Sequence, residues 1–362
     1  MKKLVFTVTN DLNYDQRMIR ICTSLASAGY NVTLLGYKLR DSLPLTTKTY
    51  FQKRFHCLFI TGKLFYVEYN LRLFFYLLFK KHDLVCAIDL DTILPCLISS
   101  KIKGTHRVYD AHELFCEMQE IVSRPFIYRI WKMIERYTVP QFRNGYTVNN
   151  IITAEFARMY NSSYGIIRNT PALRPLVIPP KDIKYIIYQG AVNEGRSFDT
   201  LIPAMKKVNA RLVIAGSGNY IGEVKKLVAE NELTDKVLFT GRLMPDELFN
   251  YTVNAWIGVT LFENIGLSNY YSLANRFFDY MHAGIPQVCV NYPVYSEINK
   301  ENPVALLIDD LNSENIADNL NQLVENDVLY RELQQNCLCQ REILNWQAEE
   351  RNLLIFYSNI FS

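Results

Sequence analysis

Short apolar runs alternate with amphipathic segments along the chain, and this alternation restricts the possible fold more than any other sequence feature. Lys3–Thr9 is rich in apolar and β-branched residues and predicts a buried strand. Residues 15–28 repeat apolar side chains at helical spacing, and Val32–Leu35 predicts a second strand. Strand–helix–strand alternation is typical of parallel, doubly wound sheets, which bind ligands at the carboxyl ends of their strands. The expected fold class is therefore α/β.

The same alternation starts again after a proline-rich stretch at residues 171–180. Tyr185–Gln189 and Arg211–Ala215 predict strands of a second sheet. Proline-rich stretches mark linkers, and 362 residues exceed what one hydrophobic core usually organises. We therefore predict three parts: a first domain at 1–170, a second domain at 171–340, and a C-terminal helix at 341–362 that crosses back to the first domain.

Composition and charge narrow the class of protein. Residues 1–170 carry 23 Lys and Arg against 13 Asp and Glu, whereas residues 171–362 carry 16 against 23. The basic half is expected to face an anionic surface or substrate. The N-terminal stretch is too short for a signal peptide, and no apolar run approaches the ~20 residues of a membrane-spanning helix. Eight scattered cysteines without a CxxC pair argue against zinc, so a cytoplasmic protein with reduced thiols is expected.

The stretch 272–286 predicts a short helix with a polar side. Ser272 is expected to cap its start, and Gly284 followed by Pro286 ends it. Its polar side combines a hydroxyl, an amide, a guanidinium and a carboxylate, from Ser272, Asn275, Arg276 and Asp279. A helix N-terminus with an Arg favours phosphate, and a carboxylate accepts hydrogen bonds from sugar hydroxyls. The pattern indicates a nucleotide-sugar diphosphate with its ribose on Asp279, or else an amphipathic helix with a solvated polar side.

Residues 48–82 combine basic and aromatic side chains. Seven Lys and Arg accompany a single acid, Glu68, and eleven Phe and Tyr are interleaved with them. Three interpretations are open: a surface that contacts an anionic membrane, a site for single-stranded nucleic acid, or a core helix with solvated flanks. We favour the core for Leu71–Phe79 and the membrane for the flanking bases. No RNP-like or helix-turn-helix signature supports nucleic acid as a partner.

Further polar residues follow predicted strands. Asp11, Asp15 and Arg17 lie after the first strand, where ligand-binding loops and structural caps are both common. His112 ends another strand beside Asp110 and Glu113, where a general base, a metal ligand or a loop cap are all possible. No second His lies at metal-binding spacing, so no metal site is expected.

A glycine motif allows a rival interpretation. Gly216, Gly218 and Gly222 follow a strand and open a helix, as in a dinucleotide fingerprint, and Arg242 is placed to accept a 2′-phosphate. The motif follows the second strand of its domain rather than the first, and no acid ends the next strand. An oxidoreductase is therefore the less favoured hypothesis.

Together these residues resemble glycosyltransferase family 4, whose members have the GT-B fold of two Rossmann-like doubly wound parallel sheets facing a cleft. The resemblance covers nearly the whole chain. It includes Asp15-x-Arg17, Asp89-Leu90-Asp91, the run 109–114 around His112, and the linker at 168–171. In the second half it includes Gly190, Arg196, the run 215–218, Gly241-Arg242, and the run 275–281, which is similar to the Asn-Lys-Leu-Phe-Glu-Tyr-Met helix of a bacterial branch.

The resemblance implies a retaining, metal-independent hexosyltransferase-like enzyme that uses a nucleotide-sugar without another cofactor. The implied acceptor is a saccharide or a lipid-linked saccharide in cell-surface polysaccharide synthesis, at the inner face of the cell membrane. The implied catalytic residues are His112, which would contact the donor sugar, and Asp279. The implied donor-side residues are Gly190, Arg196, Gly216, Gly218, Arg242, Ser272, Asn275, Arg276 and Asp279. The implied acceptor-side residues are Asp11, Asp15 and Arg17.

The chain also departs from the family pattern. The two family glutamates, eight positions apart, fall on Tyr271 and Asp279, and the usual Arg after the first Gly of the second domain is Ala191. Glu263 lies out of register to replace the first glutamate. Two further functions therefore stay open: a catalytically impaired binding or partner subunit, and a GT-B nucleotide-sugar epimerase.

Overall fold

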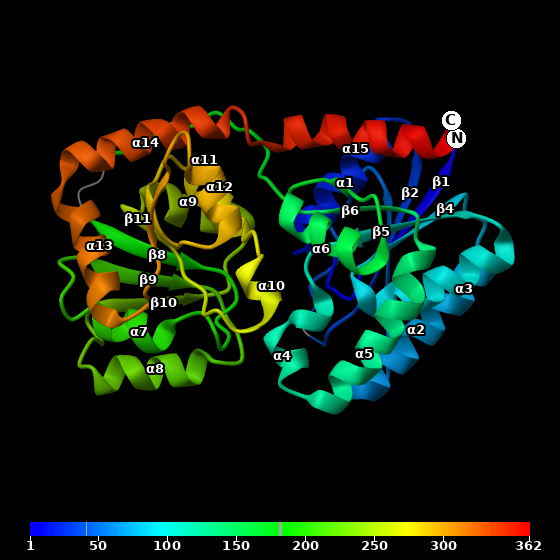
Figure 1. The fold of residues 1–362 in the computed structure, drawn as a ribbon, viewed down its shortest axis with the longest axis horizontal. Helices are drawn as coiled ribbons and strands as arrows, with labels where there is room; N and C mark the ends of the chain where they lie inside the picture. Colours follow the sequence, from blue (N-terminus) through cyan, green and yellow to red (C-terminus); the bar gives the residue numbers. More distant parts are fainter. Residues whose placement is uncertain (41, 181–182) are drawn as a thin grey trace. The chain divides into compact units, whose positions relative to one another are not determined.

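The computed structural model describes residues 1–40, 42–180 and 183–362, and it divides into two compact units (Figure 1). The first unit comprises Met1–Asn169 together with Ala348–Ser362, and the second comprises Thr170–Gln347. The segment 341–362, predicted as one crossing helix, is therefore divided. Its first residue, Arg341, ends α14 (Asp327–Arg341) of the second unit, and most of α15 (Trp346–Phe361) belongs to the first unit.

The first unit is built on a sheet of seven parallel strands in the order β3-β2-β1-β4-β5-β6-β7. Its strands are β1 (Lys3–Thr7), β2 (Asn31–Tyr37), β3 (Phe51–Phe55), β4 (Leu84–Ile88), β5 (His106–Ala111), β6 (Asn144–Thr147) and β7 (Gly165–Ile166). All five side chains of β4 are buried, as expected for a central strand covered on both faces.

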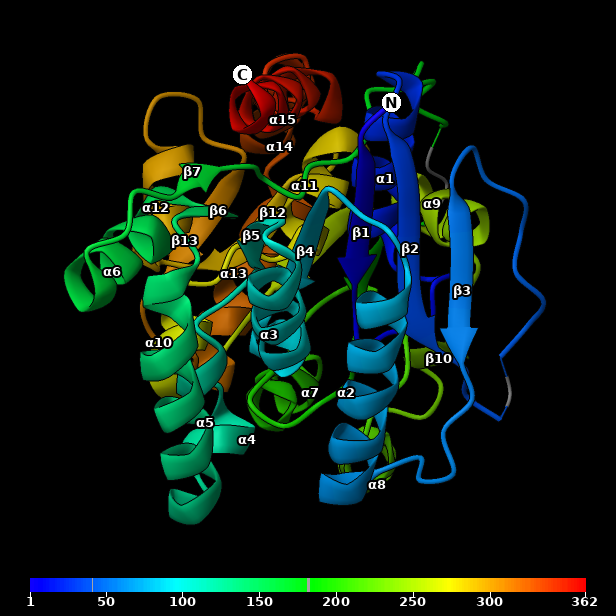
Figure 2. The same ribbon diagram turned by 90° about the vertical axis from the view of Figure 1, so that its right-hand side faces the viewer.

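Helices cover both faces of this sheet. They are α1 (Gln16–Ser27), α2 (Gly62–Phe79), α3 (Ile93–Lys103), α4 (Gln119–Val122), α5 (Pro125–Thr138), α6 (Asn150–Tyr160) and α15, with short 3-10 turns at Leu90–Thr92, Phe115–Glu117 and Val139–Gln141. Within this unit, α2, α3 and α5 lie on one face, and α1 and α15 lie on the other (Figures 1 and 2). Tyr357 of α15 contacts the rings of Phe6 and Tyr146, which anchors the C-terminal helix on the sheet.

The second unit is built on six parallel strands in the order β10-β9-β8-β11-β12-β13. The strands are β8 (Tyr185–Gln189), β9 (Arg211–Ala215), β10 (Val237–Gly241), β11 (Ile257–Thr260), β12 (Gln287–Val290) and β13 (Ala305–Ile308). The helices are α7 (Phe198–Ala204), α8 (Ile221–Glu230), α9 (Pro245–Asn254), α10 (Gly266–Tyr270), α11 (Asn275–His282), α12 (Pro293–Asn299), α13 (Ser313–Glu325) and α14 (Asp327–Arg341).

Both sheets are parallel and doubly wound, so the predicted α/β class is confirmed. Every strand pair within each sheet is parallel, so the carboxyl ends of its strands lie at one edge, and the strand order reverses direction beside β1 in the first sheet and beside β8 in the second. Loops that follow those ends converge there, and this convergence positions the polar residues of each unit. Within the described residues, no helix combines the length and apolar character that crossing a membrane requires.

Candidate functional site

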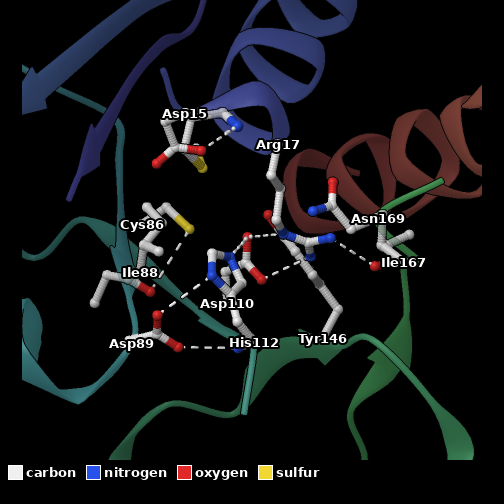
Figure 3. A network of polar contacts seen from close by, with 12 residues as sticks. Asp15, Arg17, Cys86, Ile88, Asp89, Asp110, His112, Tyr146, Ile167 and Asn169 are labelled. Atoms are coloured by element: carbon white, nitrogen blue, oxygen red, sulfur yellow. Dashed lines mark hydrogen bonds and ion pairs between the residues drawn. The ribbon is translucent and has the colours of Figure 1, made fainter. Parts of the chain in front are cut away.

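At the carboxyl edge of the first sheet, a buried ion pair joins two segments far apart in the sequence (Figure 3). Arg17 of α1 donates from Nη2 and Nε to the two carboxylate oxygens of Asp110 on β5, at 2.8 and 3.2 Å. Its Nη1 donates to the carbonyl of Ile167 at 2.9 Å. The Arg17 side chain is only 3% exposed and that of Asp110 is fully buried. The guanidinium therefore has its donors engaged within the fold.

His112 lies between two carboxylates, as Figure 3 shows. Its Nδ1 is 3.3 Å from Asp89 Oδ2 at the end of β4, and its Nε2 is 3.3 Å from Asp110 Oδ2. Burial alone would lower the pKa of this imidazole, but Asp89 and Asp110 outweigh it and raise the pKa to about 10. His112 is therefore an imidazolium at neutral pH.

Asp89 holds His112 through both the backbone and the ring. Asp89 Oδ1 accepts a hydrogen bond from the His112 backbone N–H at 3.0 Å, while Oδ2 pairs with the ring. Its φ is 54°, a value that residues other than Gly rarely adopt and that persists only where the surroundings impose it. The strand end is thus bent to aim this carboxylate at His112.

The carboxylates at this edge differ in charge. Burial alone would raise the pKa of Asp110, but Arg17 and His112 lower it to about 2. Burial and the neighbouring Asp89 raise the pKa of Asp91 to about 7, although Thr9 donates a hydrogen bond to it. The network therefore contains one carboxyl that changes charge near neutral pH.

The three residues predicted on the acceptor side all have structural partners. Asp11 is buried and paired with Arg54 of β3 at 3.0 Å, and it also binds Ser42. Asp15 caps α1 by accepting from the Met18 backbone N–H. Arg17 is held by Asp110, so its guanidinium is engaged within the fold. The sequence could not show this, because Asp110 lies 93 residues away.

In the second unit, α11 is fixed against the end of β8. The Tyr280 ring lies on Gly258 of β11, where an added Cβ would come within 2.3 Å of it. The Tyr280 hydroxyl donates to the Ile187 carbonyl at 3.0 Å and accepts from the Gln189 backbone N–H at 3.1 Å. These contacts set the position of every polar residue on α11.

Two guanidiniums gather around the ring of Phe262. Arg276 lies over Phe262 at 4.8 Å and over Tyr188 at 4.4 Å, and Arg196 lies over Phe262 at 4.5 Å. Arg276 is buried and donates from Nη1 to the Gln189 carbonyl at 3.1 Å. Within the described parts of the chain, no carboxylate forms an ion pair with Arg276. A buried cation stacked on aromatic rings favours an anionic ligand.

Asp279, predicted to hold a ribose, contacts a side chain of β8. Gln189 Nε2 donates to Asp279 Oδ2 at 2.8 Å, and Thr252 of α9 donates to Gln189 Oε1 at 2.7 Å. The Asp279 carboxylate is partly exposed.

The predicted donor-side glycines bring two loops together. A Cβ on Gly216 would lie 1.8 Å from the Gly190 carbonyl oxygen, and one on Gly218 would lie 2.2 Å from that of Val192. Gly190 itself faces Arg276, whose Nη1 is 3.8 Å from the position of its missing Cβ. The Gly216 and Gly218 positions thus allow close backbone packing at the ends of β8 and β9. Arg242, after β10, is exposed.

The region before α11 differs from the prediction. The helix begins at Asn275 with Ala274 at the cap position, so Ser272 is not its N-cap. The Ser272 hydroxyl instead donates to the Asn269 carbonyl at 2.8 Å, which closes the turn after α10. Asn275 is exposed in the first turn, and Tyr271 directly follows α10.

Glu263, on the loop after β11, contacts the loop that carries Arg196. Burial and Asp199 raise its pKa, while the Ser197 backbone N–H donates a hydrogen bond to it. Its backbone N–H binds the Gly195 carbonyl at 3.0 Å. Sequence reasoning gave no site role to Gln189 and Phe262, and it used Asp89 only for the family resemblance. The signal available for Gln189 and Asp89 was their place at the end of a strand.

Comparisons with known proteins agree with this architecture. Residues 172–337 match the family described as Glycosyl transferases group 1. No curated protein matches the sequence. Among solved structures, a sucrose-phosphate synthase from Thermosynechococcus elongatus is 16% identical with a TM-score of 0.84, and the alignment covers 100% of this chain and 99% of that chain.

Two further solved structures are similar over nearly their whole length. Anabaena HepE in complex with UDP and glucose is 12% identical with a TM-score of 0.76, covering 99% of this chain and 100% of that chain. WaaG, a glycosyltransferase involved in lipopolysaccharide biosynthesis, is 14% identical with a TM-score of 0.78, covering 98% and 99%. The predicted GT-B fold is confirmed, and together with the matched domain it supports a GT-B glycosyltransferase.

Proposed function

We propose that this chain is a retaining glycosyltransferase that moves a sugar from a nucleotide-sugar donor to a saccharide or lipid-linked acceptor. The observation that carries the proposal is the buried Arg276 guanidinium at the end of β8, stacked on Tyr188 and Phe262 without a carboxylate ion-pair partner in the described chain. With Arg196 on the same Phe262 ring, it offers positive charge for a diphosphate. The matched Glycosyl transferases group 1 domain contains both residues.

In this proposal, the bond between the anomeric carbon and the diphosphate oxygen breaks, and the acceptor hydroxyl bonds to the same face of the sugar. The acceptor proton passes to the departing phosphate. Arg276 and Arg196 stabilise the charge on that leaving group, so a metal ion is not part of the proposal. Asp279 accepts hydrogen bonds from the ribose, with Gln189 holding one of its oxygens.

The remaining predicted donor-side residues keep their proposed places. Gly190 leaves exposed backbone beside the proposed diphosphate, Gly216 and Gly218 let the neighbouring loops pack closely there, and Arg242 and Asn275 are exposed near strand and helix ends. Ser272 is proposed only as part of the turn that leads into α11.

His112 takes a modified role. Because its imidazolium is positive and both ring nitrogens face carboxylates, it is poorly suited to stabilise developing positive charge at the anomeric carbon. We assign the contact with the donor sugar instead to the loops after β4 and β5, where the Asp89 carboxylate is partly exposed beside the His112 ring. This role remains compatible with a position at the carboxyl edge of the first sheet.

The pathway and location also remain proposals. HepE was solved with UDP and glucose, and WaaG acts in lipopolysaccharide biosynthesis, which supports a nucleotide-sugar donor and a surface-polysaccharide acceptor for this chain. A cytoplasmic enzyme in peripheral contact with the inner face of the membrane fits that pathway. Tyr271 in place of the family's first glutamate favours the second candidate, an impaired binding subunit.

The test is nucleotide binding followed by sugar transfer. Thermal-shift screening against UDP, GDP, CDP, ADP and TDP should identify one stabilising nucleotide. Arg276→Met should then weaken its binding by roughly 10- to 150-fold, because a hydrogen bond to a charged group contributes about 1.5–3 kcal/mol. The matched control is Arg211→Met, which removes an exposed Arg at the opposite end of β9.

Two outcomes separate the candidates. Equal nucleotide affinity in folded Arg276→Met and wild type would contradict the diphosphate assignment. Nucleotide binding without transfer from any radiolabelled donor carrying that nucleotide would favour the impaired subunit over the enzyme.

A further inference from the structure

Helix α2 has an apolar stripe on the side that faces away from the sheet. Leu64, Val67, Leu71, Phe75 and Phe79 repeat at i, i+3, i+7, i+11 and i+15, and all five are exposed, Phe79 by 79%. The buried side consists of Phe65, Tyr69, Leu73 and Leu77. A core helix was predicted for Leu71–Phe79, but only part of that run is buried. A helix that is apolar on both sides requires a partner for its outer side.

Helix α5 repeats the pattern. Phe126, Ile130, Met133 and Tyr137 follow at i, i+4, i+7 and i+11, and Phe126 and Met133 are 66% and 65% exposed. Between the two helices, α3 exposes Ile98 and Ile102.

The three helices form one layer on the same face of the first sheet (Figure 2). Lys63 of α2 lies 5.1 Å from the ring of Phe126, and the rings of Tyr66 and Trp131 are 5.8 Å apart. Because the inner side of the layer covers the sheet, the exposed residues of all three helices point outward together. We call this surface the α2–α3–α5 face.

The charges on this face have a single sign. Every exposed charged side chain on the three helices is basic, from Lys63, Arg72, Lys101, Arg129 and Arg136. The acids on these helices are engaged within the protein. Glu68 accepts hydrogen bonds from the backbone N–H groups of Leu58 and Phe59 and pairs with Arg72 at 2.7 Å, which offsets the charge of that one base, and Glu135 is buried beside Lys132.

We propose that the α2–α3–α5 face binds the surface of an anionic lipid bilayer. Outward apolar stripes flanked by exposed bases match a surface that inserts apolar side chains at the headgroup boundary and attracts negative headgroups. Not all of the basic residues in 48–82 that suggested membrane contact lie on this face. Lys53 and Arg54 lie in β3, and Arg54 is committed to Asp11, whereas α3 and α5 supply much of the surface. This surface is independent of the sugar-transfer chemistry.

The experiment is co-sedimentation of the full-length protein with vesicles of phosphatidylcholine, alone or mixed with phosphatidylglycerol. Binding is expected only to the anionic vesicles, and it should fall as salt rises because exposed charges are screened over ~8–10 Å near physiological ionic strength. Arg129→Glu with Arg136→Glu should weaken binding at least about 25-fold, since each basic residue near an anionic surface contributes about fivefold.

A second variant tests the apolar stripes separately. Phe75→Ser with Phe79→Ser should also weaken binding, and these exposed positions leave the core intact. The matched control is Val328→Ser with Ile355→Ser, which changes two exposed apolar residues outside the face and should bind as wild type does. Circular dichroism and thermal unfolding verify that each variant is folded.

Several results would overturn the proposal. These are absence of vesicle binding, equal binding to neutral and anionic vesicles, or unchanged binding by both face variants. Concentration-dependent dimers that the face variants abolish, without vesicle binding, would assign the face to a second copy of the chain. Binding of single-stranded nucleic acid in place of vesicles would assign it to that ligand. Loss of nucleotide binding or sugar transfer would leave vesicle binding unaffected, so the two proposals fail separately.

Discussion

Replacing Asp89 by Asn should lower the pKa of His112 by several units. Asn has nearly the same shape, still accepts a hydrogen bond from the backbone N–H of His112, and tolerates a positive φ about as well as Asp. The change therefore removes one negative charge at 3.3 Å from the ring while keeping the local geometry.

The magnitude follows from that distance. Two unit charges 3.3 Å apart interact with about 5 kcal/mol at an effective dielectric constant of about 20, and one pKa unit corresponds to about 1.4 kcal/mol. Since Asp110 still faces the ring, a decrease of roughly 2–4 units is expected. The midpoint should fall from about 10 into the range of roughly 6 to 8.

The assay is NMR titration of protein labelled with carbon-13 at the histidine Cε1, with the His112 signal assigned from His112→Gln. The matched control is Asp91→Asn, which removes a carboxyl two residues away that does not contact the ring. Its effect on the His112 midpoint should be much smaller. If the midpoint in Asp89→Asn equals that of wild type, Asp89 does not hold the charge on His112.

Two further predictions concern stability. Arg17→Met leaves the Asp110 carboxylate buried without its Arg partner, so it should lower the free energy of unfolding by about 3–5 kcal/mol. The control Arg158→Met removes an exposed ion pair and should cost under about 1 kcal/mol. Equal losses for the two variants in urea unfolding would refute this prediction. Because folding raises the pKa of Asp91 from 3.8 to about 7, wild type loses stability as pH rises through that window. Asp91→Asn removes the loss, so relative to wild type it should be stabilised by about 3 kcal/mol more at pH 8 than at pH 5. The same difference at both pH values would contradict this prediction.

Much of each sheet could be predicted from the sequence because the signals are local. Lys3–Thr9 is apolar and β-branched, and β1 forms within it at Lys3–Thr7. A helix expected from residue 15 is observed as α1, with Asp15 accepting from the Met18 backbone N–H. These signals depend on neighbours within one or two turns, which the sequence states directly.

For the site residues, the sequence predicted only their place near a strand end and not the residues that they contact. His112 in the first sheet, and Arg276 and Gly190 in the second, each follow or face the end of a parallel strand, and the doubly wound topology places such ends at one edge of each sheet. Ser272 shows the limit of local reasoning, because the same hydroxyl can cap a helix or close the preceding turn. In the structure the Ser272 hydroxyl donates to the Asn269 carbonyl in the turn after α10.

The sequence by itself therefore determined that strands and helices alternate in two sheets and which polar side chains follow many of the strand ends, but it did not predict β3. Only the tertiary structure decided their partners and charges. Arg17 meets Asp110 because β5 lies two strands from β1, and His112 is positive because two strand ends bring carboxylates to both sides of one ring. Electrostatic interactions depend on distance in space and on burial, and pairs separated by tens of residues acquire both only when the sheet has formed.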